Sequence, residues 1–189
     1  MKNCLPDRVV TEPGIYIFLA AMLLLLPPVW IFSVFLAALV HELFHWAAVC
    51  LCGGRVLQIT VDAGGIRMDI APLPPGRELI CALAGPLGSG VLACFVHRMP
   101  VVGLCALVQG IFNLLPVYPL DGGRALRSML MMFLPAERAE RISHISGGIF
   151  FLCITLLGGW CMLRLSTGIL PVTLPVLLWI RWKNSNKKG

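Results

Sequence analysis

Two histidines four residues apart, with a glutamate beside the first, mark a candidate reactive centre in this chain of 189 residues. The segment His41–His45 reads His-Glu-Leu-Phe-His, the H-E-x-x-H pattern. On a helix, residues four apart lie on one face, about 6 Å apart along the axis, so both imidazoles can bind one zinc ion. Glu42 is then placed to act as a general base on water. The pattern predicts metal-dependent hydrolysis.

The surroundings of this segment are apolar on both sides, over residues 35–40 and 46–49. Ionisable groups inside a membrane segment are rare, costly and usually functional. A polar cluster that only joins helices is the alternative interpretation, and the conjunction of two histidines and a glutamate at ligand spacing makes it the less favoured one.

Catalytic zinc usually has three protein ligands, so a further buried His, Asp or Glu is expected. Most of the nine acidic residues fall in termini or loops, and Glu42 already has a role. His97 lies at the outer end of a predicted span and His144 in a predicted cytosolic loop, beside basic residues. This elimination selects Asp121 as the third ligand.

The segment 113–123, which contains Asp121, has two prolines and two glycines and cannot continue a regular helix. Broken backbone near membrane depth is tolerated only where it is buried in protein or lines a wet cavity. A catalytic metal site needs such a cavity. The simpler interpretation, a helix stop at the membrane surface, explains the prolines and glycines but not the aspartate between them.

The composition excludes a soluble globular enzyme and a disordered chain. Hydrophobic residues make up 58% of the chain and charged residues 13%, against about 25% charged in soluble domains. The basic residues form no stripe, so nucleic acid is not an expected partner. Most of the eight cysteines lie in apolar runs and are interpreted as packing residues, with no disulfide framework. The remaining class is a polytopic membrane protein.

The apolar runs predict an all-α membrane protein of about six transmembrane helices. A single membrane-embedded domain over residues 1–189 is expected, because six spans of about 20 residues leave only short loops. Between the fourth and fifth spans lies an amphipathic stretch, residues 123–142. The predicted spans are two helices within 15–52, split at Pro27-Pro28, and then 79–96, 101–115, 145–163 and 168–182.

The loop 53–78 contains a predicted β-hairpin. Polar and apolar residues alternate over 56–70 on both sides of Gly64-Gly65. Period-two patterning around a Gly-Gly turn indicates two strands with one apolar face.

The basic residues predict the orientation in the cell membrane. With the N-terminus in the cytosol, thirteen of the fifteen Lys and Arg residues fall in inner segments, and the other two are Arg98 and Arg164. This asymmetry is the one that the positive-inside rule requires. Both termini are therefore predicted to be cytosolic, with an even number of spans between them.

Three motifs resemble the site-2 protease family, peptidase family M50, and in particular its stage IV sporulation protein FB branch. They are His41–His45, the Ala-Gly-Pro-Leu of residues 84–87, and the Asn-Leu-Leu-Pro-Val-Tyr-Pro-Leu-Asp-Gly-Gly of residues 113–123. The likeness covers roughly residues 15–130, the expected catalytic core, in matching order and spacing. The two C-terminal spans, within 145–182, lie beyond it.

The resemblance implies an intramembrane zinc metalloendopeptidase that binds one zinc ion. It implies substrates that span or adjoin the bilayer, such as precursors of transcription factors or anti-sigma factors, and a regulatory membrane protein as a candidate partner. It does not indicate the oligomeric state. The residues carried over are the zinc ligands His41, His45 and Asp121, the base Glu42, and the supporting residues Asn113 and Pro119. The turn of Gly64 and Gly65 resembles that of the family's membrane-associated β-hairpin, which implies that this hairpin supports the active site.

The chain departs from the family pattern at two positions and in length. Phe44 replaces the usual glycine of the histidine motif, and Ser89 stands where many members have asparagine. The chain ends soon after Trp182, so no C-terminal CBS domain is expected. The loop 53–78 is too short for a PDZ domain, since domains start at about 50 residues.

A different functional class remains open as an alternative. A non-catalytic metal-binding membrane scaffold or a metal transporter would also carry buried ligands, although a transporter spreads them along a path. A serine protease is less favoured, because the residues around Ser89 lack the first glycine of a G-x-S-G motif. A serine between glycines more often packs helices together.

Overall fold

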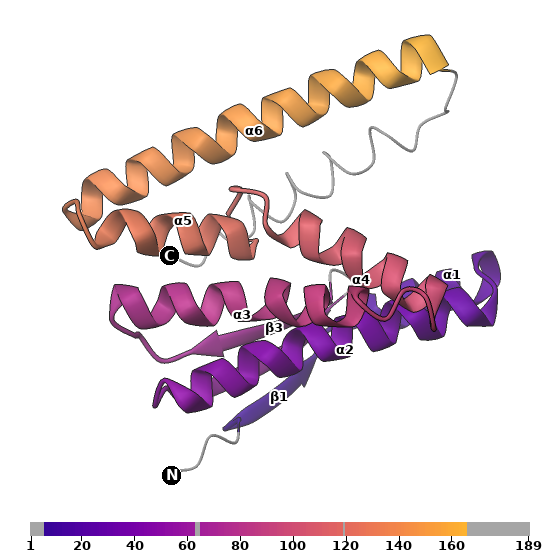
Figure 1. The fold of residues 1–189 in the computed structure, drawn as a ribbon, viewed down its shortest axis with the longest axis horizontal. Coiled ribbons are helices and arrows are strands. Elements are labelled where there is room, and N and C mark those ends of the chain that lie inside the picture. The colour runs from indigo at the N-terminus through magenta and orange to yellow at the C-terminus, as the bar shows by residue number, and fades with distance from the viewer. Residues whose placement is uncertain (1–5, 63–64, 119, 166–189) are drawn as a thin grey trace. The chain divides into compact units, whose positions relative to one another are not determined.

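The computed structural model describes residues 6–62, 65–118 and 120–165, which are mostly helical with one small three-stranded sheet. This confirms the predicted helical class and the hairpin (Figure 1). The chain divides into two compact units, Met1–Leu114 and Leu115–Gly189.

The first unit contains four helices, three of which begin at a proline. They are α1 (Gly14–Leu25), α2 (Pro28–Leu51), α3 (Pro75–Ala93) and α4 (Pro100–Asn113). Proline suits the first helical position, because its fixed φ is helical and its missing N–H would have no partner there. Helix α2 ends at Leu51, and Gly53, two residues further on, has a φ of 72°, the left-handed conformation typical of the residue that follows a helix C-terminus.

The sheet has the strand order β1-β2-β3, with β1 (Arg8–Thr11) parallel to β2 (Val56–Asp62) and β3 (Gly65–Ile70) antiparallel to it. The β2–β3 pair is the predicted hairpin. Gly65 has a φ of 117°, which favours glycine at the turn, whereas Gly64 lies outside the described residues. Strand β1 was not predicted, because four residues are too few to display an alternating pattern.

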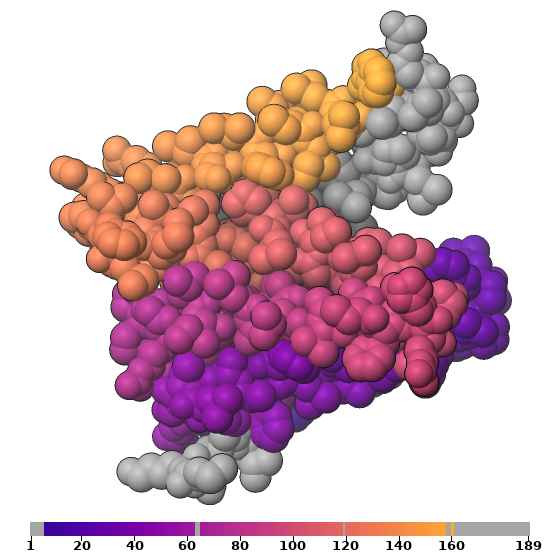
Figure 2. All heavy atoms as spheres, viewed as in Figure 1, coloured from indigo at the N-terminus to yellow at the C-terminus, as the bar shows by residue number. Residues whose placement is uncertain are grey.

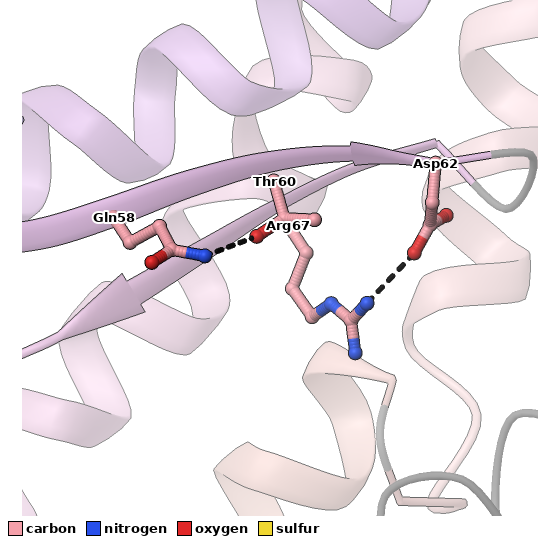
Figure 3. A network of polar contacts seen from close by, with 4 residues as sticks. All are labelled: Gln58, Thr60, Asp62 and Arg67. Carbon is pink, nitrogen blue, oxygen red and sulfur yellow. Dashed lines mark hydrogen bonds and ion pairs between the residues drawn. The ribbon is translucent and has the colours of Figure 1, made fainter. Parts of the chain in front are cut away.

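The hairpin has one apolar and one polar face, as its alternation predicted. Its apolar side chains, among them Ile59 and Met68, pack against α2 and α3 around a buried cluster that includes Val49 and Cys81. Figure 3 shows the polar side chains on the other face, where Gln58 donates a hydrogen bond to Thr60 Oγ1 over 3.0 Å and Arg67 pairs with Asp62 over 2.7 Å. The sheet is thereby fixed to the two helices that carry the candidate site.

The second unit begins with a helical hairpin of α5 (Asp121–Met131) and α6 (Ala136–Leu165). The single amphipathic stretch predicted for residues 123–142 is therefore divided. Pro135 explains the division, because proline cannot continue a helix through its own N–H. Helix α6 begins at Ala136 and includes the predicted fifth span, whereas the predicted span 168–182 lies outside the described residues.

Within the described part of the chain, two helices are long and apolar enough to cross a membrane. They are Pro28–Leu51, of mean hydropathy 1.8, and Ala136–Leu157, of mean hydropathy 1.3. Helices α1 and α4 are apolar but have 12 and 14 residues, about 18 and 21 Å long, short of a hydrocarbon core of about 30 Å. The six predicted transmembrane helices are therefore not all established by length and composition.

The cysteines differ in state. Cys50, near the end of α2, is disulfide-bonded, so the interpretation of the cysteines as packing residues is wrong there. Cys81 fits that interpretation, since it is buried in the core cluster. The free cysteines of the described residues are Cys52, Cys81, Cys94, Cys105 and Cys153.

Candidate metal centre

The two histidines of α2 lie side by side and buried. His41 is 2% exposed and His45 7%. Their Nε2 atoms are 3.2 Å apart, and their rings meet edge to face with centroids 4.8 Å apart. About one helical turn separates the two residues, so the four-residue spacing explains why both side chains lie on one face of α2. The structure therefore brings these two predicted ligands together.

Helix α3 holds the opposite nitrogen of each ring. His45 Nδ1 lies 2.7 Å from the carbonyl oxygen of Cys81, and His41 Nδ1 lies 2.8 Å from Ser89 Oγ. A carbonyl only accepts hydrogen bonds, so His45 carries its proton on Nδ1 and presents a lone pair at Nε2. Metal-binding histidines commonly have this arrangement, in which a second group fixes the tautomer and the ring orientation.

The separation of the two Nε2 atoms suits a zinc ion. Two nitrogens at about 2.0–2.1 Å from a tetrahedral zinc lie about 3.3 Å from each other. The distance between His41 Nε2 and His45 Nε2 is 3.2 Å. The distance between the pair therefore matches that of two nitrogen ligands of one zinc ion, of the three protein ligands that a catalytic site usually has.

Gly85 of α3 faces both Nε2 atoms. A Cβ at this position would lie 2.6 Å from His41 Nε2 and closer still to His45 Nε2. Any side chain would occupy the space in which the two lone pairs converge. Glycine is thus required here by close approach, and α3 forms one wall of the candidate metal centre.

Phe44, the departure from the family pattern, packs against α3. A Cβ at Gly88 would lie 2.5 Å from Phe44 Cγ, so the ring occupies the space that a side chain at position 88 would fill. The bulk gained at position 44 is accommodated by a glycine on the facing helix. Figure 2 shows the atoms of α2, α3 and α4 adjoining one another in a continuous surface. The substitution leaves the histidine pair intact.

Asp121 is the first residue of α5, in the second unit, and is 7% exposed. Its carboxylate lies 3.7 Å from the guanidinium of Arg124, one turn further on. A negative charge is favourable at a helix N-terminus. Gly123 allows this turn to form, because a Cβ there would lie 2.5 Å from the backbone nitrogen of Tyr118.

The other predicted site residues have diverse positions. Glu42 is partly exposed on α2, beside His41. Asn113 is the last residue of α4, and its side-chain amide donates to the carbonyl of Gln109 over 3.1 Å. Gly65 opens β3 at the hairpin turn. Two of them, Pro119 and Gly64, lie outside the described residues.

Sequence reasoning missed the stripe of α3 that faces the histidines. Cys81, Gly85 and Ser89 are spaced by four residues and lie on one face of that helix, as His41 and His45 do on α2. Small residues at this spacing permit close helix approach. The spacing is visible in the sequence, but nothing in it assigns the stripe to the histidines before the helices are packed.

Residues 82–156 match the model of peptidase family M50. This range contains Asp121 and the α3 stripe from Gly85 onward, but not the histidine pair. The zinc metalloprotease MJ0392 of Methanocaldococcus jannaschii is 29% identical over 139 residues, which are 66% of this chain and 41% of that protein. Stage IV sporulation protein FB of Bacillus subtilis is 27% identical over 166 residues, 78% of this chain and 57% of that protein.

The fold also has a solved counterpart. A site-2 protease from Methanocaldococcus jannaschii superposes with a TM-score of 0.72, covers 93% of this chain and 90% of its own, and is 21% identical. The chain spans about half the length of the two relatives matched by sequence. The resemblance drawn from the three motifs is confirmed: the chain contains a peptidase family M50 region within the fold of a site-2 protease.

Proposed function

We propose that the protein is an intramembrane zinc metalloendopeptidase that hydrolyses peptide bonds in or near the transmembrane segments of membrane-associated substrates. The observation that carries the proposal is the buried histidine pair of α2. The Nε2 atoms of His41 and His45 are 3.2 Å apart, and α3 holds both Nδ1 atoms. The name of one relative, the zinc metalloprotease MJ0392, supports the same chemistry.

Each side chain has a distinct task in this proposal. Zinc, when bound, would lower the pKa of water and polarise the scissile carbonyl. His41 and His45 hold the ion, and Asp121, which is also buried, is the third ligand of the proposal. Glu42 takes a proton from the attacking water and returns it to the leaving amine. Asn113 and Pro119 help to orient the substrate or a ligand.

The proposal includes a location and an orientation. The protein is a multi-pass protein of the cell membrane, a single domain over residues 1–189, with both termini in the cytosol. The fifteen basic residues support this topology through their asymmetric distribution. Its partners are the lipid bilayer, a membrane-protein substrate such as a transcription factor precursor or an anti-sigma factor, and a regulatory membrane protein.

Replacing the third ligand tests the metal centre. Asp121→Ala is expected to lose activity together with metal, because two histidines alone form an incomplete set of ligands. Metal analysis of the purified full-length protein in detergent measures this. Glu137→Ala, at an exposed acid in the first turn of α6, is the matched control and should keep its zinc. Full zinc occupancy in Asp121→Ala would assign the third ligand to another residue, for instance His144.

The hairpin is proposed to bind the substrate as an added strand. A helical substrate conceals its scissile carbonyl in its own hydrogen bonds, and pairing an unwound segment with a sheet edge exposes the bond while satisfying its neighbours. Strand β1 covers one side of β2, so β3 provides the second edge of the described sheet. This edge includes Gly65, at the turn.

Proline substitutions along β3 test this role. Successive N–H groups of a strand point to opposite sides, so proline at alternate positions of residues 66–70 removes those facing away from β2. That series is expected to impair cleavage while zinc stays bound. Proline at the other alternate positions removes the N–H groups that face β2. That second series disrupts pairing between β2 and β3, so it measures whether cleavage needs the sheet to be intact. Unchanged turnover in both series would refute the role.

A combined measurement separates the enzyme from the alternative, a metal-binding scaffold or transporter. Purified protein reconstituted in lipid vesicles is assayed for bound zinc and for cleavage of co-reconstituted membrane proteins. The enzyme shows both zinc and cleavage, and cleavage stops when a chelator removes the metal. Membrane proteomes of cells that carry the wild type or Glu42→Gln are compared to find cleaved proteins. Bound zinc without cleavage of any membrane protein would favour the scaffold.

A further inference from the structure

The two histidines of the candidate metal centre are held by α3 in different ways. His45 Nδ1 is paired with a backbone carbonyl, that of Cys81, and His41 Nδ1 with a side-chain hydroxyl, that of Ser89. A carbonyl fixes the tautomer of its partner, because it can only accept. A hydroxyl both donates and accepts, so two tautomers of His41 are compatible with the observed 2.8 Å.

The tautomer of His41 decides whether the pair can bind a metal ion. With the proton on Nδ1, Ser89 accepts it, and two Nε2 lone pairs converge. With the proton on Nε2, His41 donates to His45 Nε2 across the 3.2 Å between them, and neither lone pair is available. Neutral histidine binds zinc through the unprotonated nitrogen, so the first state is the one required.

The position of the Ser89 hydroxyl is fixed from the side of α4. Ser89 is completely buried, and Gly110 of α4 packs directly on it. A Cβ at Gly110 would lie 2.9 Å from Ser89 Cβ and 3.7 Å from its Oγ. Helix α3 lies between α2 and α4 (Figure 1), so Ser89 contacts His41 on one side and Gly110 on the other.

We infer that Ser89 is a positioning residue for the metal centre: its hydroxyl accepts the Nδ1 proton of His41, holds that histidine in the tautomer that binds metal, and is kept in place by Gly110 of α4. This role rests on the proposed zinc site.

Zinc affinity of the purified full-length protein in detergent is the first readout. Ser89→Ala is expected to weaken zinc binding by about 10–100-fold, the usual loss when the hydrogen-bond partner of a ligating histidine is removed. Ser33→Ala is the matched control, since Ser33 is a buried serine of α2 that donates to the carbonyl of Val29 over 2.6 Å. The control should bind zinc as the wild type does.

The tautomer itself is the second readout, and a purely structural role for Ser89 would not change it. Nitrogen-15 spectra of histidine-labelled, metal-free protein, wild type and variant alike, distinguish protonated from unprotonated ring nitrogens. The wild type is expected to carry the His41 proton on Nδ1. Metal-free Ser89→Ala is expected to show it on Nε2, because Nδ1 has lost its acceptor.

Gly110→Ala tests the same contact without altering the hydroxyl. A methyl group at this position must displace Ser89 and is expected to weaken zinc binding in the same direction. Gly90→Ala is its control, because a Cβ there meets no atom within 4 Å. In the Ser89→Ala background, Gly110→Ala should cause no further loss of affinity, because both changes act through one hydrogen bond.

The outcomes separate this inference from the proposed zinc site. A wild-type protein that binds no zinc would overturn the site itself. A wild type that binds zinc, with Ser89→Ala binding equally tightly and His41 still protonated at Nδ1, would overturn the role of Ser89 alone. Additive losses in the double variant would show that Gly110 acts through a contact other than Ser89.

Discussion

Gly85→Ala is expected to abolish zinc binding, and proteolysis with it, while leaving the fold intact. The new methyl group would overlap both Nε2 atoms of the histidine pair, since its Cβ lies 2.6 Å from His41 Nε2 and closer to His45 Nε2. Metal–ligand distances tolerate about ±0.2 Å. Displacing a ligand itself should therefore weaken zinc binding by more than the roughly 10–100-fold loss of affinity that follows from altering its hydrogen-bond partner.

The measurement for Gly85→Ala is zinc affinity by competition with a chelating dye, accompanied by a thermal unfolding curve. Alanine is a better helix former than glycine by about 1 kcal/mol, so the substitution should stabilise α3 itself. A loss of zinc binding would then not result from a weakened helix. Gly90→Ala makes the same change five residues further along the same helix, where the Cβ meets open space, and should keep its zinc. Wild-type affinity in Gly85→Ala would mean that α3 moves away from α2 without cost.

The predictable part of the site consisted of polar residues in apolar surroundings. The motif His41–His45 predicted that both imidazoles lie together, because a four-residue spacing on a helix places two side chains on one face. Asp121 followed by elimination among few intramembrane acids, and its location at the first turn of α5 agrees with the predicted break in the chain. The hairpin over 56–70 was similarly evident from its alternation.

What could not be predicted depends on contacts between distant segments. Gly85 and Ser89 acquire their roles only once α3 lies against α2, and a single sequence does not encode which helix faces share a contact. Strand β1 forms because β2 offers it an edge, and the paired residues, such as Arg8 and Gln58, lie 50 positions apart in sequence. The continuous helix α6 joins an amphipathic segment to an apolar one, which composition alone divides.

Glu42→Gln is expected to retain one zinc ion per chain and to lose proteolysis by about 10²–10⁴-fold, the usual contribution of a general acid–base. Glutamine has the size and polarity of glutamate but cannot take up a proton from water. Glu42 follows His41 on α2 and is partly exposed, so water can reach it. The proposed metal ligands are elsewhere, on His41, His45 and Asp121.

The decisive comparison for Glu42 is of two quantities measured on one preparation. Glu78→Gln, at a half-buried glutamate in the first turn of α3, is the matched control and should retain both zinc and cleavage. If Glu42→Gln cleaves at the wild-type rate, another group is the base. If the variant loses zinc as well, Glu42 is required for metal binding and its role as a base is not established. Loss of cleavage with zinc retained separates catalysis from metal binding, which is the distinction between a protease and a metal-binding scaffold.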